Sequence, residues 1–264
     1  MKDFPRKFLV YALQFMIYGL ILCGCISTEY NVATGKQDVF LYSTAREVSM
    51  GQNIAKRIAK EFKLSRNPYD IQRVDKIAKK IVENVDRREI SYYFYVIEED
   101  QEAKSQINAF SIPGGYVYIY KELLDLLSDD EVAFVIAHEV GHIVSRHQIK
   151  RLQAAMGYNL VMVASSVARS SPEFQQGLSF ALAQIFMGYS RQDEFNADEL
   201  AVKYCRMAGF DPSVGIAVQE KLYKENKKKI NPLSYFRTHP YTAQRIRHIK
   251  ETLHLPLDVA DYIN

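Results

Sequence analysis

Two histidines and a glutamate are spaced as in a metal-dependent hydrolase. Residues 138–142 read His-Glu-Val-Gly-His. Positions i and i+4 of an α-helix lie on one face, so the imidazoles of His138 and His142 can reach the same cation. Glu139 is their neighbour on that surface and can hold a water molecule rather than the cation. This pattern predicts metal-assisted hydrolysis with Glu139 as the general base.

Zinc is the cation that best suits these donors. A catalytic zinc ion has three protein ligands and one open position, where it lowers the pKa of bound water to about 7. We therefore expect one Zn²⁺ per chain and hydrolysis of a peptide bond. Glu139 would accept the proton of the attacking water and pass it to the leaving amine. The rival interpretation is a surface helix with two incidental histidines.

The third ligand must come from another part of the chain. A later helical stretch contains Glu194 and Asp198, which lie at i and i+4 and therefore share one face. One carboxylate could bind the cation while the other orients a ligand histidine through its second ring nitrogen. Residue chemistry alone does not choose between these two, and it does not exclude Asp193.

The residues that directly follow the motif are poor candidates for the third ligand. A metzincin would have glycine at position 145 and histidine at position 148, where this chain has Ser145 and Gln148. His147 lies nine residues beyond His138, which places it on the opposite side of a continuous helix. We interpret His147 as an ordinary helix-end residue.

Periodicity and turn signals predict a helix-rich α+β domain with one small sheet. Thr44 to Glu47 and Ser128 to Glu131 have the pattern of capping boxes and mark two helix starts. Pro113-Gly114-Gly115 is a turn between two strands. Strands are expected at 92–97, 107–112 and 116–120, and helices at about 44–62, 67–85, 128 through the motif, 150–168, 173–188, 191–207, from 211 onward, and 240–253.

Four sequence blocks together resemble metallopeptidase family forty-eight, which belongs to the gluzincins. The blocks, in chain order, are Asn108-Ala109-Phe110, Pro113-Gly114-Gly115, His138 to His142, and Ser190-Arg191 with Glu194 and Ala197-Asp198. The resemblance spans roughly residues 30–254 and implies a helix-rich zincin (gluzincin) fold with one small mixed β-sheet. It also implies that Glu194 is the third metal ligand and that Asp198 orients a ligand histidine. The stretch 31–36 resembles exported lipoprotein members of the family.

The resemblance also indicates how a substrate is held. In gluzincins the substrate backbone pairs with the edge strand of the small sheet, and here Asn108, Ala109 and Phe110 would supply that edge. The alternative is that Asn108 caps a turn and that Phe110 belongs to the core. Which of the two applies determines whether these residues bind substrate.

Thr238-His239-Pro240 with Arg245 resembles the late His-Pro motif of the family. His239 could approach the zinc or stabilise the oxyanion, with Arg245 supporting it. Alternatively, His239 simply precedes a helix that has proline in its first turn. A single histidine does not distinguish these possibilities.

The N-terminus has the layout of an export signal. Lys2, Arg6 and Lys7 precede an apolar stretch that ends Leu22-Cys23-Gly24-Cys25, which resembles a bacterial lipobox. We expect a lipoprotein signal peptide at 1–24, lipidation of Cys25, a loosely structured tether at 25–42 and a zinc metallopeptidase domain at 43–264. The alternative is an uncleaved membrane anchor. Cys205 would then have no disulfide partner and is expected to be buried.

Composition excludes some functions and agrees with others. The 264 residues carry a formal charge of +3 and show no basic stripe with interleaved aromatics, so no nucleic-acid partner is expected. Taken together, these features predict a periplasmic endopeptidase, lipid-anchored to the outer or inner membrane, that cleaves misfolded or misassembled envelope proteins. A chaperone-like binder of unfolded envelope polypeptides, with little proteolysis, is the alternative. Prenyl-peptide processing is a weaker one.

Overall fold

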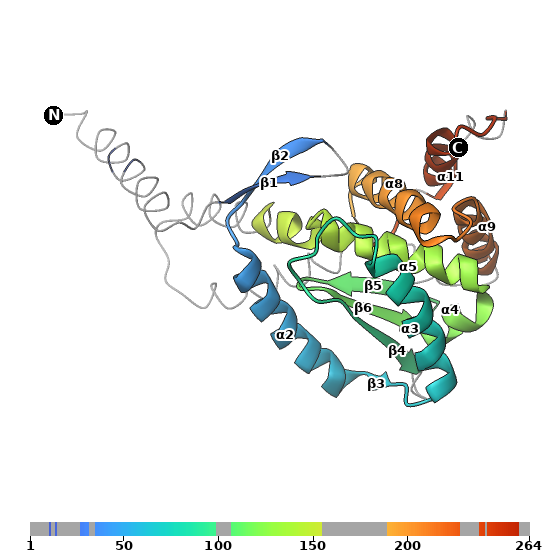
Figure 1. Ribbon diagram of the computed structural model, residues 1–264, viewed down its shortest axis with the longest axis horizontal. Helices are drawn as coiled ribbons and strands as arrows, with labels where there is room; N and C mark the ends of the chain where they lie inside the picture. The colour runs from blue at the N-terminus through green and yellow to red at the C-terminus, as the bar shows by residue number, and fades with distance from the viewer. Residues whose placement is uncertain are drawn as a thin grey trace.

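Helices pack around a small β-sheet in this protein (Figure 1). The computed structural model describes residues 11, 14, 27–31, 35–98, 107–154, 189–227, 238–240 and 242–258. The strands are β1 (Ser27–Asn31), β2 (Lys36–Phe40), β3 (Lys63–Leu64), β4 (Tyr93–Glu98), β5 (Ala109–Ile112) and β6 (Tyr116–Tyr120). The helices are α2 (Thr44–Glu61), α3 (Pro68–Val82), α4 (Lys121–Leu126), α5 (Asp129–Val144), α8 (Arg191–Ala208), α9 (Val214–Lys227) and α11 (Thr242–Thr252).

The main sheet is mixed, as the family resemblance implies. Its strand order is β3-β4-β6-β5, with β4 parallel to β6 and the other two pairs antiparallel. β6 is central and buried along its whole length. Its alternation sends Val117 and Ile119 toward a core that includes α3 and α5, and sends Tyr118 and Tyr120 toward Ile58 of α2. β5 forms one edge of this sheet, beside α5.

The helix that carries the motif is α5, and it is buried from Glu131 to Ile143. Its predicted start is confirmed. The Ser128 hydroxyl accepts a hydrogen bond from the Glu131 backbone, and the Glu131 carboxylate accepts one from the Ser128 backbone. Such a reciprocal cap fixes the start of the helix, and hence the rotation of the residues that follow it.

A glycine lets α8 pack closely against α5. A Cβ on Gly141 would lie 3.0 Å from the carbonyl oxygen of Ala197 and 3.1 Å from its Cα. Because both are backbone atoms, any side chain at position 141 would push α8 away. The close approach brings the first turns of α8 beside the motif. α8 itself begins with a capping box of Ser190 and Asp193 and ends at Gly209, whose φ is +78°.

The start of α2 is where predicted, but its cap is different. Ser43, not Thr44, is the N-cap residue. Glu47 is 1% exposed and does not complete a capping box; its carboxylate oxygens lie 2.9 Å from Nη1 of Arg87 and 2.8 Å from Nε of Arg146. Because Glu47 is buried, its carboxylate is stabilised more by charged partners than by a capping hydrogen bond at an exposed helix end. Those partners come from distant segments of the chain.

Within the predicted tether 25–42, the described residues 27–31 and 35–42 include two strands. Strands β1 and β2 form an antiparallel hairpin. Phe40, at its end, is buried beneath the guanidinium of Arg146, whose carbon lies 4.0 Å from the ring centroid. The side-chain amide of Gln153 bonds the backbone of Val39 and Leu41. Contacts with the domain hold the hairpin, so the local sequence does not reveal it.

Some expectations concern residues outside the described ranges. These are nearly all of the signal segment 1–24, Cys25, and most of the helical patterns at 150–168 and 173–188, of which residues 150–154 are seen as helix. The short elements β3 and α4 were not predicted. Cys205 is buried, as expected. No helix in the described part of the chain is long and apolar enough to cross a membrane.

Replacing Gly51 with alanine should destabilise the fold. The new Cβ would lie 2.0 Å from the carbonyl oxygen of Pro113, so α2 and the 113–115 turn would have to separate. We expect a loss of about 1–3 kcal/mol in the free energy of unfolding, measured by urea denaturation. Ser49→Ala, on the exposed face of the same helix, should change it by less than about 0.5 kcal/mol. Equal stability of both variants would contradict the close contact.

Candidate metal centre

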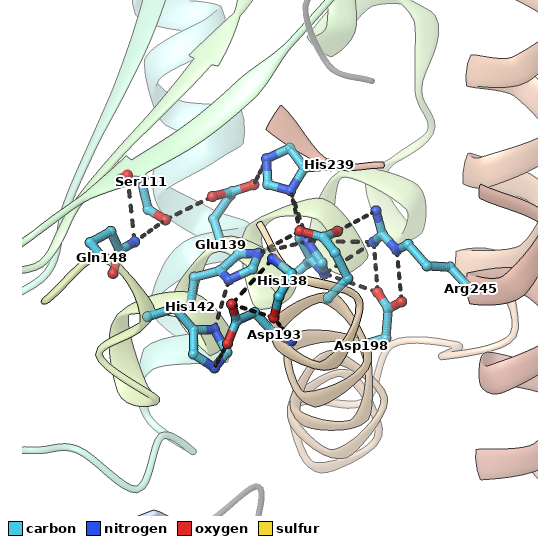
Figure 2. A network of polar contacts seen from close by, with 12 residues as sticks. Ser111, His138, Glu139, His142, Gln148, Asp193, Asp198, His239 and Arg245 are labelled. Carbon is cyan, nitrogen blue, oxygen red and sulfur yellow. Dashed lines mark hydrogen bonds and ion pairs between the residues drawn. The ribbon is translucent and has the colours of Figure 1, made fainter. Parts of the chain in front are cut away.

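Four buried side chains from three segments converge on one point. His138 and His142 come from α5, Glu194 from the first turn of α8, and His239 from the segment before α11 (Figure 2). One donor atom of each lies within 4.8 Å of one donor atom of all the others. The Nε2 atoms of His138 and His142 are 3.1 Å apart, and Glu194 oxygens lie 3.5 Å and 3.4 Å from them.

Asp198 determines which nitrogen of His138 faces this point. Its Oδ1 lies 2.9 Å from Nδ1 of His138, and a carboxylate can only accept, so Nδ1 carries the proton. Nε2 of His138 then faces the other donors. Arg245 holds Asp198 in turn, with Nε donating at 2.8 Å to Oδ2 and Nη2 at 2.7 Å to Oδ1. Such support fixes the ring of a metal-binding histidine.

His142 is oriented in a comparable way by two residues. Its Nδ1 lies 2.9 Å from Nδ1 of His147, whose Nε2 lies 3.4 Å from Oδ1 of Asp193. Burial lowers the pKa of His147 to about 4, so this ring is neutral at pH 7. One of the two rings donates to the other across this contact. In either direction it occupies Nδ1 of His142 and leaves Nε2 of that ring facing the convergence point.

His147 is thus not the ordinary helix-end residue that the sequence suggested. It is fully buried and contacts a motif histidine. A continuous helix would place His147 on the side opposite His138, but α5 ends at Val144, and Arg146 has a left-handed backbone with φ of +53°. This break turns His147 back toward His142. His147 is not among the four converging side chains.

The donor set fits a cation. The Nε2 atoms of His138 and His142 lie 3.1 Å apart, close enough to share one positive charge, a proton or a metal ion. Burial and Arg245 disfavour a charge on His138, yet contacts with Asp198 and Glu194 raise its pKa to about 9, so the site favours a positive charge at this ring. Burial would raise the pKa of Glu194, but Arg245 and His239 hold it well below its usual range, so this carboxylate is charged. Nitrogen and carboxylate donors of this kind suit a borderline divalent ion such as zinc.

Glu139 is fully buried beside the donor group but is not part of it. Its Oε2 accepts a hydrogen bond from the Ser111 hydroxyl at 2.8 Å, and its Oε1 lies 3.2 Å from Nε2 of His239 (Figure 2). His239 also reaches the donors, because its Nδ1 lies 3.3 Å from Nε2 of His138 and 3.2 Å from Oε1 of Glu194. His239 therefore bridges the carboxylate of the motif and the donors, and does not merely precede a helix.

Arg245 is fully buried and joins both carboxylates of α8. Besides its two bonds to Asp198, its Nη1 lies 2.7 Å from Oε2 of Glu194. The sequence suggested Arg245 as a residue that supports the metal ligands together with Asp198, and in the structure it contacts both Glu194 and Asp198. One guanidinium thus keeps two negative side chains together in the interior, where neither would be stable alone.

Three residues near the site were missed from the sequence. Ser111 and Gln148 contact each other and Ser111 contacts Glu139, while the ring of Tyr189 stacks on His142 with centroids 3.7 Å apart. Burial raises the pKa of Tyr189, so its phenol stays protonated. Tyr189 directly precedes the Ser190-Arg191 block, which was the one available signal. Nothing local distinguishes Ser111 from any other strand residue.

The predicted substrate-binding residues lie at the sheet edge. Ala109 and Phe110 belong to β5, and Asn108 directly precedes it, with its carbonyl oxygen accepting from Tyr120 N at 3.0 Å. Asn108 is buried, Ala109 is fully buried and Phe110 is partly buried, stacked on Tyr118 with centroids 5.1 Å apart. Phe110 is thus part of the aromatic core, as the alternative interpretation had it, while its backbone belongs to an edge strand.

Comparison with known proteins agrees with this geometry. The model of peptidase family M48 matches residues 65–253. Metalloprotease LoiP of Escherichia coli K12 is 26% identical over 254 residues, which cover 90% of this chain and 94% of that protein. The beta-barrel assembly-enhancing protease of Yersinia pestis is 25% identical over 77% of this chain, which spans only 43% of its length. Mitochondrial metalloendopeptidase OMA1 of Schizosaccharomyces pombe is 27% identical over 68% of this chain and 52% of its own length.

Replacing Asp198 with asparagine should weaken metal binding. The change keeps the shape of the side chain but removes the charge that orients His138 and pairs with Arg245. We expect the affinity for Zn²⁺ to fall about 10-fold to 100-fold in competition with a chelator. Glu199→Gln is the matched control, because Glu199 is the next residue of α8 and pairs with His248 instead. Wild-type affinity in the Asp198 variant would contradict the orienting role.

Proposed function

This chain belongs to peptidase family M48, and on that premise we propose that it is a zinc-dependent endopeptidase of the bacterial cell envelope that cleaves misfolded or misassembled envelope proteins. The observation that carries the proposal is the buried convergence of two motif histidines and a distant carboxylate on one point, with the motif glutamate beside them but outside the group.

We assign the metal to His138, His142 and Glu194. Hydrogen bonding supports this choice, because the partners of both rings occupy Nδ1 and leave the Nε2 atoms directed at the shared point. Glu194 is charged and lies opposite them. Three protein ligands leave one coordination position for water or substrate, as a catalytic site requires. Asp198 and Arg245 then act as the residues that orient His138.

Glu139 is the proposed general base. When bound, zinc would supply Lewis acidity, which polarises the peptide carbonyl and makes a nearby water more acidic. The carboxylate of Glu139 takes the proton from the attacking water and delivers it to the leaving amine. Its burial keeps bulk water away from this proton, and its position outside the ligand group leaves it able to accept one.

His239 is proposed to stabilise the oxyanion. A site with four protein donors would have no open position, so a catalytic role favours three ligands and a separate function for His239. Its ring lies between Glu139, the proposed base, and Glu194, a proposed ligand, and is therefore close to where a substrate carbonyl would react. A donor aimed at that charge stabilises the transition state.

Substrate is proposed to bind by strand addition along β5. This strand ends the four-stranded order of the described sheet and packs beside α5, which carries Glu139. A polypeptide paired with the backbone at Asn108, Ala109 and Phe110 would run past the metal ligands. Main-chain pairing requires an extended substrate and no particular side chains, which suits unfolded proteins.

The N-terminal sequence supports the proposed lipid anchor, and a relative supports the proposed location in the cell envelope. The N-terminal pattern of an export signal ends in Cys25, which we propose is lipidated and holds the protein at the periplasmic face of a membrane. One relative is named a beta-barrel assembly-enhancing protease, a name that describes a role in the assembly of envelope proteins. Signal peptide 1–24, tether 25–42 and peptidase domain 43–264 remain the proposed organisation.

Replacing Glu139 with glutamine should abolish cleavage and retain the metal. We expect the rate of casein hydrolysis to fall by about 100-fold to 10,000-fold, because the amide cannot accept the proton. Elemental analysis should still find zinc in Glu139→Gln, whereas His138→Ala and Glu194→Ala should lose it. Equal zinc in all four proteins would overturn the ligand assignment. Full rescue of a deletion strain by Glu139→Gln would favour the binding function over proteolysis.

Replacing His239 with alanine separates its two candidate roles. If it stabilises the oxyanion, kcat should fall by about 100-fold while zinc content stays at the wild-type value. His248→Ala is the control, because His248 lies on α11 and pairs with Glu199. Loss of zinc from the His239 variant would instead make His239 a fourth ligand and contradict the assignment made above.

A further inference from the structure

The carboxylate of Glu139 is held by a hydrogen-bonded pair that contributes nothing to the metal ligands. On the premise that Glu139 is the general base, we propose that Ser111 positions this carboxylate for proton transfer and that Gln148 positions Ser111. Neither residue contacts the convergent donors in the described contacts, and neither belongs to the blocks that carry the family resemblance.

The contacts are short and lie in the interior. The Ser111 hydroxyl lies 2.8 Å from Oε2 of Glu139, and Nε2 of Gln148 lies 2.8 Å from the same hydroxyl (Figure 2). Ser111 is 5% exposed, Gln148 1% and Glu139 0%. Because water does not compete at such depth, each hydrogen bond constrains its partners more than it would at the surface.

The direction of both bonds follows from the chemistry of the groups. Nε2 of Gln148 also lies 3.5 Å from the backbone carbonyl oxygen of Ser111, which can only accept, so the amide nitrogen must face Ser111. Gln148 therefore donates to the hydroxyl oxygen. The hydroxyl proton is then directed to Glu139, whose carboxylate can only accept. The chain of donation runs from Gln148 to Ser111 to Glu139.

This arrangement holds one oxygen of the base and leaves the other facing the site. With Oε2 bound by Ser111, Oε1 is directed toward His239, 3.2 Å from its Nε2. Glu194 and Asp198 are held by the cationic Arg245, whereas Ser111 is a neutral donor. Glu139 can thus accept a proton on Oε1 without breaking an ion pair, because Oε2 is held only by a hydrogen bond from the neutral Ser111 hydroxyl. Correct orientation of a proton acceptor is a large part of its catalytic effect.

The fold brings the pair together from two segments. Strand alternation in β5 sends Ala109 and Ser111 toward α5, while Phe110 and Ile112 pack with the aromatic residues on the opposite face. Gln148 lies beyond the end of α5, where the left-handed Arg146 reverses the chain toward the sheet. A register shift of one residue in β5 would remove the hydroxyl from Glu139.

Steady-state kinetics of metal-loaded full-length protein test the proposal. In Ser111→Ala, we expect kcat to fall about 10-fold to 100-fold, the effect of losing one hydrogen bond to a charged group, with KM within about 2-fold. Ser111→Thr keeps the hydroxyl on a strand residue and should recover most of kcat. Ser145→Ala is the control, since it removes a buried hydroxyl that has no hydrogen-bond partner among the described residues and should leave kcat unchanged.

Gln148 should act only through Ser111. Gln148→Met keeps the length of the side chain but cannot donate, so we expect a smaller fall in kcat than for Ser111→Ala. The double variant should be no slower than Ser111→Ala alone, because the two residues work as a unit. Additive losses would show that Gln148 acts by another route and would overturn this part of the proposal.

Two measurements without turnover exclude a merely structural effect. Zinc content should be the same in wild type, Ser111→Ala and Gln148→Met. Because Ser111 also lies on the proposed substrate edge, the Kd of an uncleaved peptide should be compared between Glu139→Gln and Glu139→Gln/Ser111→Ala. We expect equal values, whereas weaker binding or lost zinc in the Ser111 variants would overturn the positioning role.

The outcomes also separate this proposal from the function on which it rests. If wild type cleaves peptides and Ser111→Ala matches it, or if Ser111→Thr is as slow as Ser111→Ala, the positioning role is wrong and the peptidase assignment stands. If Glu139→Gln is as active as wild type, Glu139 is not the base and both proposals fail.

Discussion

Two imidazole nitrogens held 3.1 Å apart in the interior form the interaction on which the rest of the structure depends. Each ring has a partner on its other nitrogen, Asp198 for His138 and His147 for His142, so that both Nε2 atoms face the same point. A single positive charge shared by these two atoms, a proton or a metal ion, stabilises this geometry. The buried charges of Glu194 and Asp198 lie beside the same two rings and are held there by ion pairs with Arg245.

Keeping so much charge in the interior requires an exact fit between α5 and α8, which Gly141 permits by its contact with the Ala197 backbone. An isolated buried carboxylate or guanidinium would be strongly unfavourable, and removal of one partner would leave the others unpaired. We therefore expect the buried charged residues of the metal centre to fold into place together, and the loss of one to disrupt the others. The second buried cluster, in which Glu47 binds Arg87 and Arg146, sets the turn after α5 and so the position of the residues that follow it.

The sheet and the helices have different roles at the site. The helices supply the converging donors, while β5 supplies the hydroxyl that contacts Glu139 and the edge along which we propose that substrate binds. The base and the substrate would thus be positioned by the same strand. Such an arrangement keeps the proton acceptor in register with the bond to be cleaved, since any displacement of the strand moves both together.

The sequence by itself determined the motif helix, its Ser128 cap, the start and end of α8 and the three main strands, because each depends on contacts within a few residues. It also indicated Glu194 and Asp198 through their spacing and the family blocks. Tertiary structure alone decided that His147 contacts His142, that Glu47 pairs with distant arginines rather than capping a helix, and that Ser111 reaches Glu139. These contacts join residues across a chain reversal or between separate segments, and no local pattern of residue types encodes the distance between two elements.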